Sequence, residues 1–251
     1  MMPGRVWFLG GLLWLATGPL VLQADDRTVY PFAPRPAERV SPTALPRIPI
    51  ELVPPGLQER VQSVLNSPAM TSKAQPEAFQ CDSNVYRWLL DHPDLAVKLW
   101  KQVGARVQDI KERGDGVYIW KDEHGSEINW HSALKATGLH MWYAEGKVKP
   151  NALLPLTSFR ALAILVYREG KDVSGKPAVE HQVHFLLRCD SKTVSLAARL
   201  LGASMPRMAE QYLGQLQMFY GGMAWYLCQD EQRCRKLYRQ IGLEVAEPTT
   251  P

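Results

Sequence analysis

The spacing of apolar residues between 191 and 242 is the strongest constraint on the fold, because it predicts a long C-terminal helix. Five apolar side chains recur there at intervals of three and four, on one helix face: Leu213, Leu216, Tyr220, Met223 and Leu227. Pro206 should divide this helix into residues 191–201 and 206–228. The residues upstream are rich in β-branched and aromatic side chains. We therefore expect an antiparallel sheet packed on the helix.

Six strands are expected upstream of that helix, at residues 105–112, 117–120, 128–136, 139–145, 158–168 and 179–189. Turn residues such as Gly114-Asp115-Gly116 separate them at hairpin distances, which favours a meander. In the last strand the odd positions, from Val179 to Leu187, form the inward face. The strand at 158–168 is apolar on both faces, so we expect the helix to cover one face and loops or a partner the other.

A short strand at residues 78–82 and two small helices precede this meander. Ser83 is expected to cap the first helix, residues 84–90, and Gly104 to end the second, residues 94–103. Further upstream, Pro55 suits the first turn of a helix that runs to Asn66. A polar loop is expected to fill the space between this helix and the first strand.

The N-terminus predicts export. Arg5 precedes an apolar run, residues 6–22, that ends at Ala24, which is the order of a signal peptide over residues 1–24. The protein would then be secreted or lie in the periplasm or cell envelope. An uncleaved membrane anchor is the alternative, since about 20 apolar residues span a bilayer. Eight prolines within residues 25–55 predict an extended tether, followed by a short helix and loop over 56–77.

The order of these elements resembles the helix-grip fold of the START-like (SRPBCC) superfamily, which includes polyketide cyclases and the birch-pollen-allergen group. The segment 79–94, FQCDSNVYRWLLDHPD, is similar to the first strand and helix pair of that superfamily. The resemblance implies an α+β domain over residues 78–242, with a disordered tail over 243–251. A curved antiparallel sheet of six to seven strands would pack on the long C-terminal helix, with two short helices after the first strand.

The resemblance also implies an apolar cavity between sheet and helix, for a lipid, sterol or polyketide. The lining residues expected from it are Trp130, Trp142, Ile164, Val183, Phe185, Met208, Tyr212, Leu216, Phe219, Tyr220 and Met223. Methionines along the helix suit an adaptable wall, but the same side chains also suit a filled core. Gly221 and Gly222 each destabilise a helix by about 1 kcal/mol relative to alanine, so their presence needs an explanation. The alternatives are close approach of a strand or ligand, a kink, or a helix end.

Histidine is the residue type that offers acid–base chemistry here. His181 and His184 are three apart on a strand, so they point to opposite faces and cannot share a metal through that spacing. His181 falls on the apolar face, where a polar group needs a partner or a purpose, and it is our first choice for a general base. A hydrogen-bonded structural histidine is the alternative. The sequence has no nucleophile elbow, phosphate-binding loop, dinucleotide fingerprint or zinc-spaced cluster, and we expect no cofactor and no metal.

Four cysteines in an exported chain are expected to form two disulfides, with three possible connectivities. Cys228 and Cys234 are close in sequence and can meet through a turn. Cys81 and Cys189 would then pair, since the resemblance places the first and last strands side by side. Free thiols are the alternative if the chain is not exported.

These features leave three hypotheses of function. The first is an exported binding module for a hydrophobic small molecule or lipid, with possible contact with a membrane surface or the envelope. The second is a cyclase, hydrolase or isomerase that uses the same cavity, with His181 as base. The third is an envelope interaction protein with a filled core. The net charge of +4 is spread over mixed acids and bases, which gives no indication of nucleic-acid binding. We favour the binding module.

Overall fold

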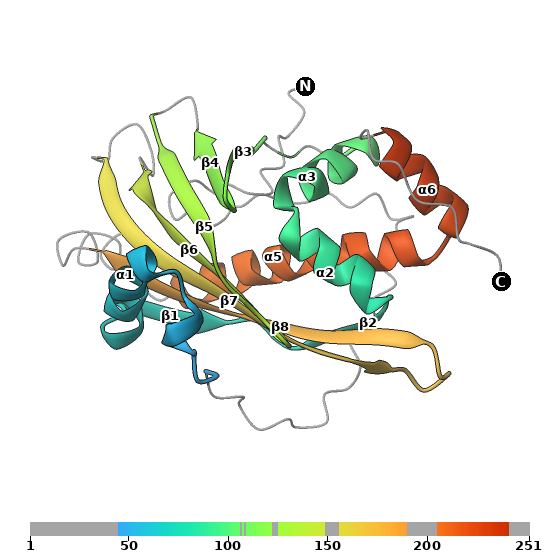
Figure 1. Cartoon of the computed structure of the whole chain (residues 1–251), viewed down its shortest axis with the longest axis horizontal. Coiled ribbons are helices and arrows are strands. Elements are labelled where there is room, and N and C mark those ends of the chain that lie inside the picture. The colour runs from blue at the N-terminus through green and yellow to red at the C-terminus, as the bar shows by residue number, and fades with distance from the viewer. Residues whose placement is uncertain are drawn as a thin grey trace.

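The computed structural model describes residues 45–105, 107, 109–121, 125–148, 156–189 and 205–240. A curved eight-stranded antiparallel sheet lies against one long helix, α5 (Met205–Cys228) (Figure 1). The main path of the sheet runs β1-β8-β7-β6-β5-β4-β3, and β2 also pairs with β8. Its strands are β1 (Met70–Lys73), β2 (Glu77–Gln80), β3 (Lys111–Gly114), β4 (Val117–Lys121), β5 (Glu127–Ala136), β6 (Leu139–Val148), β7 (Thr157–Lys171) and β8 (Pro177–Cys189). The expected helix-grip α+β fold is confirmed.

Two short strands share the edge formed by β8. β1 pairs with the second half of β8 and β2 with its first half, and Ala74 between them still donates its N–H to the carbonyl of Val183. We expected a polar loop where β1 lies. β1 is polar in sequence (MTSK), and the backbone hydrogen bonds that it receives from β8 are not visible in its residue types.

Three further helices lie on the same side of the sheet as α5 (Figure 1). They are α2 (Ser83–Asp91), α3 (Pro93–Gln102) and α6 (Glu231–Gln240). α2, α3 and α6 all contact α5, and α3 also contacts α6. The N-cap of α2 is Asp82, whose Oδ1 accepts from the N–H of Asn84 at 2.7 Å, so Ser83 is the first helical residue and not the expected cap. We did not predict α6 as a separate helix.

A fourth helix, α1 (Pro55–Asn66), covers the opposite face of the sheet with the short helix η2 (Ile50–Leu52) (Figure 1). Val53, Val61 and Val64 are buried there at 1% exposure or less, in a second core with side chains from β5 to β8. This is why β7 is apolar on both faces: its own chain covers each side. Val53, expected within an extended tether, is instead buried in this core, and Ile48 and Ile50 pack against it.

The first core lies between the sheet, α2, α3 and α5. The inward side chains of β8 belong to it in the expected alternation, with Val179, Val183 and Phe185 all buried. The strand expected at residues 105–112 is shorter, because β3 begins at Lys111. The Gly114-Asp115-Gly116 turn is confirmed, with φ of 93°, 53° and 69°. This backbone favours glycine at two of the three positions.

Several expectations lie outside the described residues: the signal peptide at 1–24, the first part of the tether, the helix at 191–201 and the tail at 243–251. The side chains of Met208 and Tyr212 are also outside them. Within the described part of the chain, no helix has both the length and the apolar character needed to cross a bilayer.

Candidate functional site

Strands β4, β5 and β6 place large aromatic side chains on the concave face, below α5. Together with Tyr220 of α5, they form what we call the aromatic cluster: Tyr118, Trp120, Trp130, Trp142 and Tyr220. Side chains two residues apart on a strand share a face, which brings Tyr118 and Trp120 together on β4. Pairing sets Trp130 opposite Tyr118. The cluster is therefore a product of strand register.

Ring contacts join four members of the aromatic cluster in two pairs. Trp142 stacks on Tyr220 with centroids 5.4 Å apart and ring planes 7° from parallel. Trp130 meets Tyr118 edge to face at 5.9 Å. His140 also stacks on Trp142, with ring centroids 4.2 Å apart. Such pairs contribute about 0.5–1.5 kcal/mol beyond the burial of their area, so the cluster has a defined geometry.

The polar atoms of the aromatic cluster are its unusual feature. The indole N–H groups of Trp120, Trp130 and Trp142 are buried without a hydrogen-bond partner among the described residues, and so is the hydroxyl of Tyr220. Each unpaired buried donor costs about 1–3 kcal/mol. An indole N–H can only donate, so these atoms need acceptors. Four such atoms on one face indicate an acceptor group that the described chain does not supply.

Small side chains lie beside these rings on the concave face. Ala144 on β6 and Ala161 and Ala163 on β7 occupy positions where the strands could carry large residues. Trp130 and Ala144 are only partly buried. Solvent therefore reaches this region only beside Trp130 and Ala144, whereas Trp142 and Tyr220 are 3% and 0% exposed.

Most of the predicted cavity residues lie in the concave core: Trp130, Trp142, Val183, Phe185, Leu216, Phe219, Tyr220 and Met223. Ile164 does not. It is fully buried on the other face of the sheet, in the core that includes Val61 and Val64 of α1. Tyr118 and Trp120 were not among the predicted residues, although their spacing of two within β4 places both on one face; their position beside Trp130 depends on the register of β4 and β5.

His181 is in the concave core, but in a closed environment. Its side chain is 0% exposed and lies edge to face against Phe79 and Tyr86. Its Nδ1 is 2.6 Å from the hydroxyl of Tyr86, and its Nε2 is 3.5 Å from Oε2 of Glu77, which is longer than an ordinary hydrogen bond. Burial lowers the pKa of His181, against the opposing effect of Glu77.

The protonation of His181 follows from these neighbours. The lowered pKa makes the imidazole neutral, and Glu77 can only accept while it is ionised. We therefore assign the proton to Nε2, so that Nδ1 accepts from the Tyr86 hydroxyl. This chain of contacts connects β2, α2 and β8, which is the environment of a structural histidine. Catalysis by His181 stays a prediction.

Gly221 explains how α5 can pass so close to His181. A Cβ at this position would lie 2.9 Å from Cε1 of His181 and 3.0 Å from Cε1 of Phe79. Of the explanations that the sequence leaves open for this glycine, close approach of a strand is thus the one that applies. At Gly222 a Cβ would meet Met218 at 3.5 Å and Trp100 at 3.7 Å, which are ordinary contacts.

The cysteines do not form the expected pairs, and no disulfide bond is present among them. Cys81 follows β2, and its N–H donates to Pro177 at the start of β8. Cys189 is twelve residues further along β8, which is about 40 Å at the rise of an extended strand. The expected Cys81–Cys189 pairing is therefore wrong. The Sγ of Cys81 instead lies 2.9 Å from Sγ of Cys228, so the expected Cys228–Cys234 pairing is also wrong in this structure.

No group of three or more potential metal ligands is found among the described residues. The histidines are separated instead: His140 is buried beside Trp142, with Nε2 3.1 Å from Oγ of Ser132. Burial lowers the pKa of His140 to about 3. A neutral His140 adds a second ring to the stack below Tyr220.

The chain matches no protein-family model and no curated protein. Among solved structures it is similar to a conserved protein from Geobacillus kaustophilus, at 10% identity and a TM-score of 0.38, over 60% of this chain and 95% of the other. It is also similar to truncated norcoclaurine synthase from Thalictrum flavum, at 13% identity and a TM-score of 0.32, over 59% and 93%. A third similar structure is that of an uncharacterised protein from Rhizobium leguminosarum. Its identity is 13% and its TM-score 0.31, over 60% of this chain and 96% of the other. At these identities the likeness concerns the fold alone.

Proposed function

We propose that the protein is a binding module for a flat apolar small molecule that carries acceptor oxygens. The ligand would lie on the concave face, against the aromatic cluster. The observation that carries this proposal is the group of unpaired buried donors on Trp120, Trp130, Trp142 and Tyr220. A mostly apolar site with a few convergent polar groups is the usual composition of a small-molecule pocket.

The ligand chemistry follows from the donors and their surroundings. Indole N–H groups and a phenol favour carbonyl, ether or ester oxygens over amines, which would bring further donors. The stacked rings of Trp142 and Tyr220 favour a flat or extended apolar body. A lipid or lipid-like compound with oxygen functions has both properties.

The proposal is tested with two probes of one shape, 2-acetylnaphthalene and 2-ethylnaphthalene, which differ in a carbonyl oxygen. Isothermal titration of the purified protein should show saturable binding of the ketone, about tenfold tighter than that of the hydrocarbon. This ratio corresponds to a net hydrogen bond of about 1.4 kcal/mol. Equal affinities would remove the role of the donors, and no binding of either probe would refute the proposal.

A pair of tryptophan variants locates the site. Trp142→Phe keeps an aromatic ring against Tyr220 but removes the N–H, so it should reduce the preference for the ketone. Trp88→Phe is the matched control, because Trp88 packs on His92 and Tyr238 outside the aromatic cluster. It should leave both affinities unchanged. Loss of preference in the control alone would place the site elsewhere.

We also propose that residues 1–24 direct export, on the order of Arg5, the apolar run and Ala24. The intact mass of the protein in the cytosolic, membrane and extracytoplasmic fractions tests this. A chain that begins at Asp25 supports a cleaved signal peptide. A full-length chain in the membrane fraction would favour the anchor, and a full-length chain in the cytosol would refute export.

A further inference from the structure

Cys81 and Cys228 meet where the start of the domain contacts the end of its long helix. Cys81 lies directly before the N-cap of α2, and Cys228 is the last residue of α5. They are 147 positions apart in sequence, yet their Sγ atoms are 2.9 Å apart. A covalent S–S bond is about 2.0 Å long, so the two atoms are about 0.9 Å from bonding distance.

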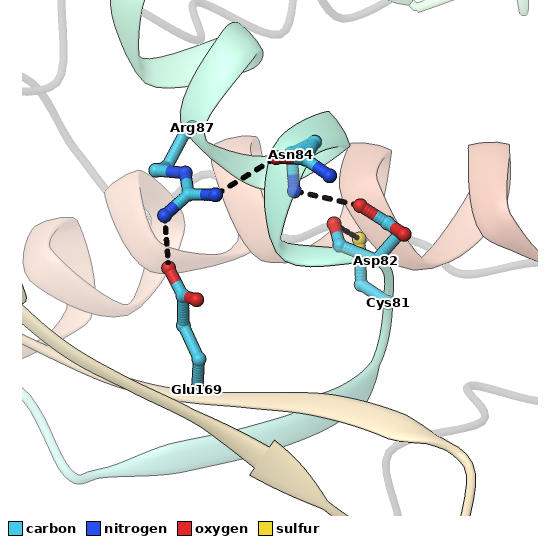
Figure 2. A network of polar contacts seen from close by, with 5 residues as sticks. All are labelled: Cys81, Asp82, Asn84, Arg87 and Glu169. Carbon is cyan, nitrogen blue, oxygen red and sulfur yellow. Dashed lines mark hydrogen bonds and ion pairs between the residues drawn. The ribbon is translucent and has the colours of Figure 1, made fainter.

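The backbone around the two thiols is held by other contacts. Cys81 donates its N–H to the carbonyl of Pro177 at 3.1 Å, and the next residue, Asp82, caps α2. Figure 2 shows this start of α2, where Arg87 joins Asn84 and Glu169 and the Sγ of Cys81 points to the Asp82 carbonyl at 3.0 Å. The backbone that carries Cys81 is therefore held by contacts with β8 and at the start of α2, in addition to its contacts with Cys228.

The two thiols have different chemical environments. Cys228 lies against the thiol of Cys81 and accepts a hydrogen bond from the N–H of Asp82 at 3.3 Å, and these contacts lower its pKa. The contact with Cys228 and burial raise the pKa of Cys81. Cys228 is partly exposed, whereas Cys81 is 2% exposed. Cys228 is accordingly the thiol that an external reagent can reach, and Cys81 is placed behind it.

We propose that Cys81 and Cys228 form a redox-active dithiol that closes to a disulfide and fastens the end of α5 to the start of α2. The oxidant is a small or protein disulfide. The Cys228 thiolate attacks one of its sulfurs and releases one thiolate, and the Cys81 thiolate then displaces the second from the mixed disulfide. Two protons leave the cysteines, and the oxidant is reduced to two thiols.

The disulfide would strengthen the attachment of α5 to the sheet. α2 contacts both α5 and β8, so a disulfide at this point ties α5 to the sheet edge through α2. A loop of this length restricts the unfolded chain strongly in the chain-entropy model. The oxidised protein should melt about 10 °C above the reduced protein. The reduced form keeps the same packing without the link.

The test uses the full chain, equilibrated with oxidised glutathione, blocked with iodoacetamide and digested without reduction. Mass spectrometry should find a Cys81–Cys228 linked peptide, and dithiothreitol should release it and lower the melting temperature. Cys228→Ser should abolish both effects. Cys234→Ser is the matched control on α6, and it should abolish neither. Alkylation of both Cys81 and Cys228 after oxidation, or linkage of either to another cysteine, would overturn the proposal.

Discussion

Two Tyr→Phe variants have opposite predicted effects on stability, although each removes one hydroxyl from a side chain that is 0% exposed. In Tyr220 the hydroxyl has no partner among the described residues. In Tyr86 the hydroxyl lies 2.6 Å from Nδ1 of His181. Both rings have aromatic neighbours that phenylalanine preserves: Trp142 and Phe219 around Tyr220, and Phe79 and Tyr167 around Tyr86. Only the hydrogen bond distinguishes the two variants.

The magnitudes follow from the cost of an unpaired buried group. Tyr220→Phe removes a desolvated hydroxyl that costs about 1–3 kcal/mol, so ligand-free protein should gain about 1 kcal/mol of unfolding free energy. Tyr86→Phe loses its hydrogen bond and leaves the buried Nδ1 of His181 without a donor, and it should lose about 1–3 kcal/mol. In a chain of this size these changes correspond to about 2–4 °C in melting temperature per kcal/mol.

Thermal unfolding at pH 8, where the lowered pKa keeps His181 neutral, checks both variants against the unsubstituted protein. The melting temperature should rise for Tyr220→Phe and fall for Tyr86→Phe. A clear loss in Tyr220→Phe would mean that its hydroxyl has a partner in the free protein. The proposed ligand site would then have three unpaired donors and not four.

Three further predictions concern the packing and pH response of the fold. Gly221→Ala should destabilise the protein by about 1–3 kcal/mol, because its Cβ would lie 2.9 Å from His181. Gly222→Ala should instead stabilise the protein by up to about 1 kcal/mol through helix propensity. Urea denaturation measures both variants, and equal effects would contradict this prediction. The low pKa of His140 means that the unfolded chain takes up a proton that the folded chain does not, so stability is lost as the pH falls below about 6.5. Between pH 7 and 5 this loss of unfolding free energy is about 2 kcal/mol. Unfolding curves of the unsubstituted protein and of His140→Asn at both pH values should show that the variant lacks this loss. The same pH dependence in both proteins would refute the prediction. Finally, Val61→Ala should lower the unfolding free energy by about 2 kcal/mol if α1 belongs to the folded unit. Leu52 is 60% exposed, so Leu52→Ala should lower it by less than about 0.5 kcal/mol. No effect of Val61→Ala would mean that the fold does not need α1.

The parts of the fold that could be predicted from sequence are those with a local signal. Pro55 at the first turn and the apolar spacing that follows predicted α1 with its observed bounds, Pro55–Asn66. The alternation of β8 predicted its inward face correctly. Strand β1 gave no such signal, because its four residues owe their conformation to pairing with β8.

The errors in the candidate site have a common cause: a local sequence pattern does not determine which distant residues come into contact. β7 is apolar on both faces, so its sequence could not decide that Ile164 faces α1 and not α5. The Cys81–Cys189 pairing failed because adjacency of two strands does not say which ends meet. Antiparallel pairing brings the end of β2 to the start of β8. The contact with Cys228 depends on where α5 ends.

The most direct test of the ligand site is the indole region of a ¹⁵N–¹H NMR spectrum, recorded while 2-acetylnaphthalene is added. The chain has eight tryptophans, and single Trp→Phe variants assign their N–H signals. Binding should move the signal of at least one of Trp120, Trp130 and Trp142 downfield, because the single carbonyl oxygen accepts from one or two N–H groups, and it should leave the signal of Trp88 in place. Saturation of the protein without movement of these three signals would contradict the proposed ligand site.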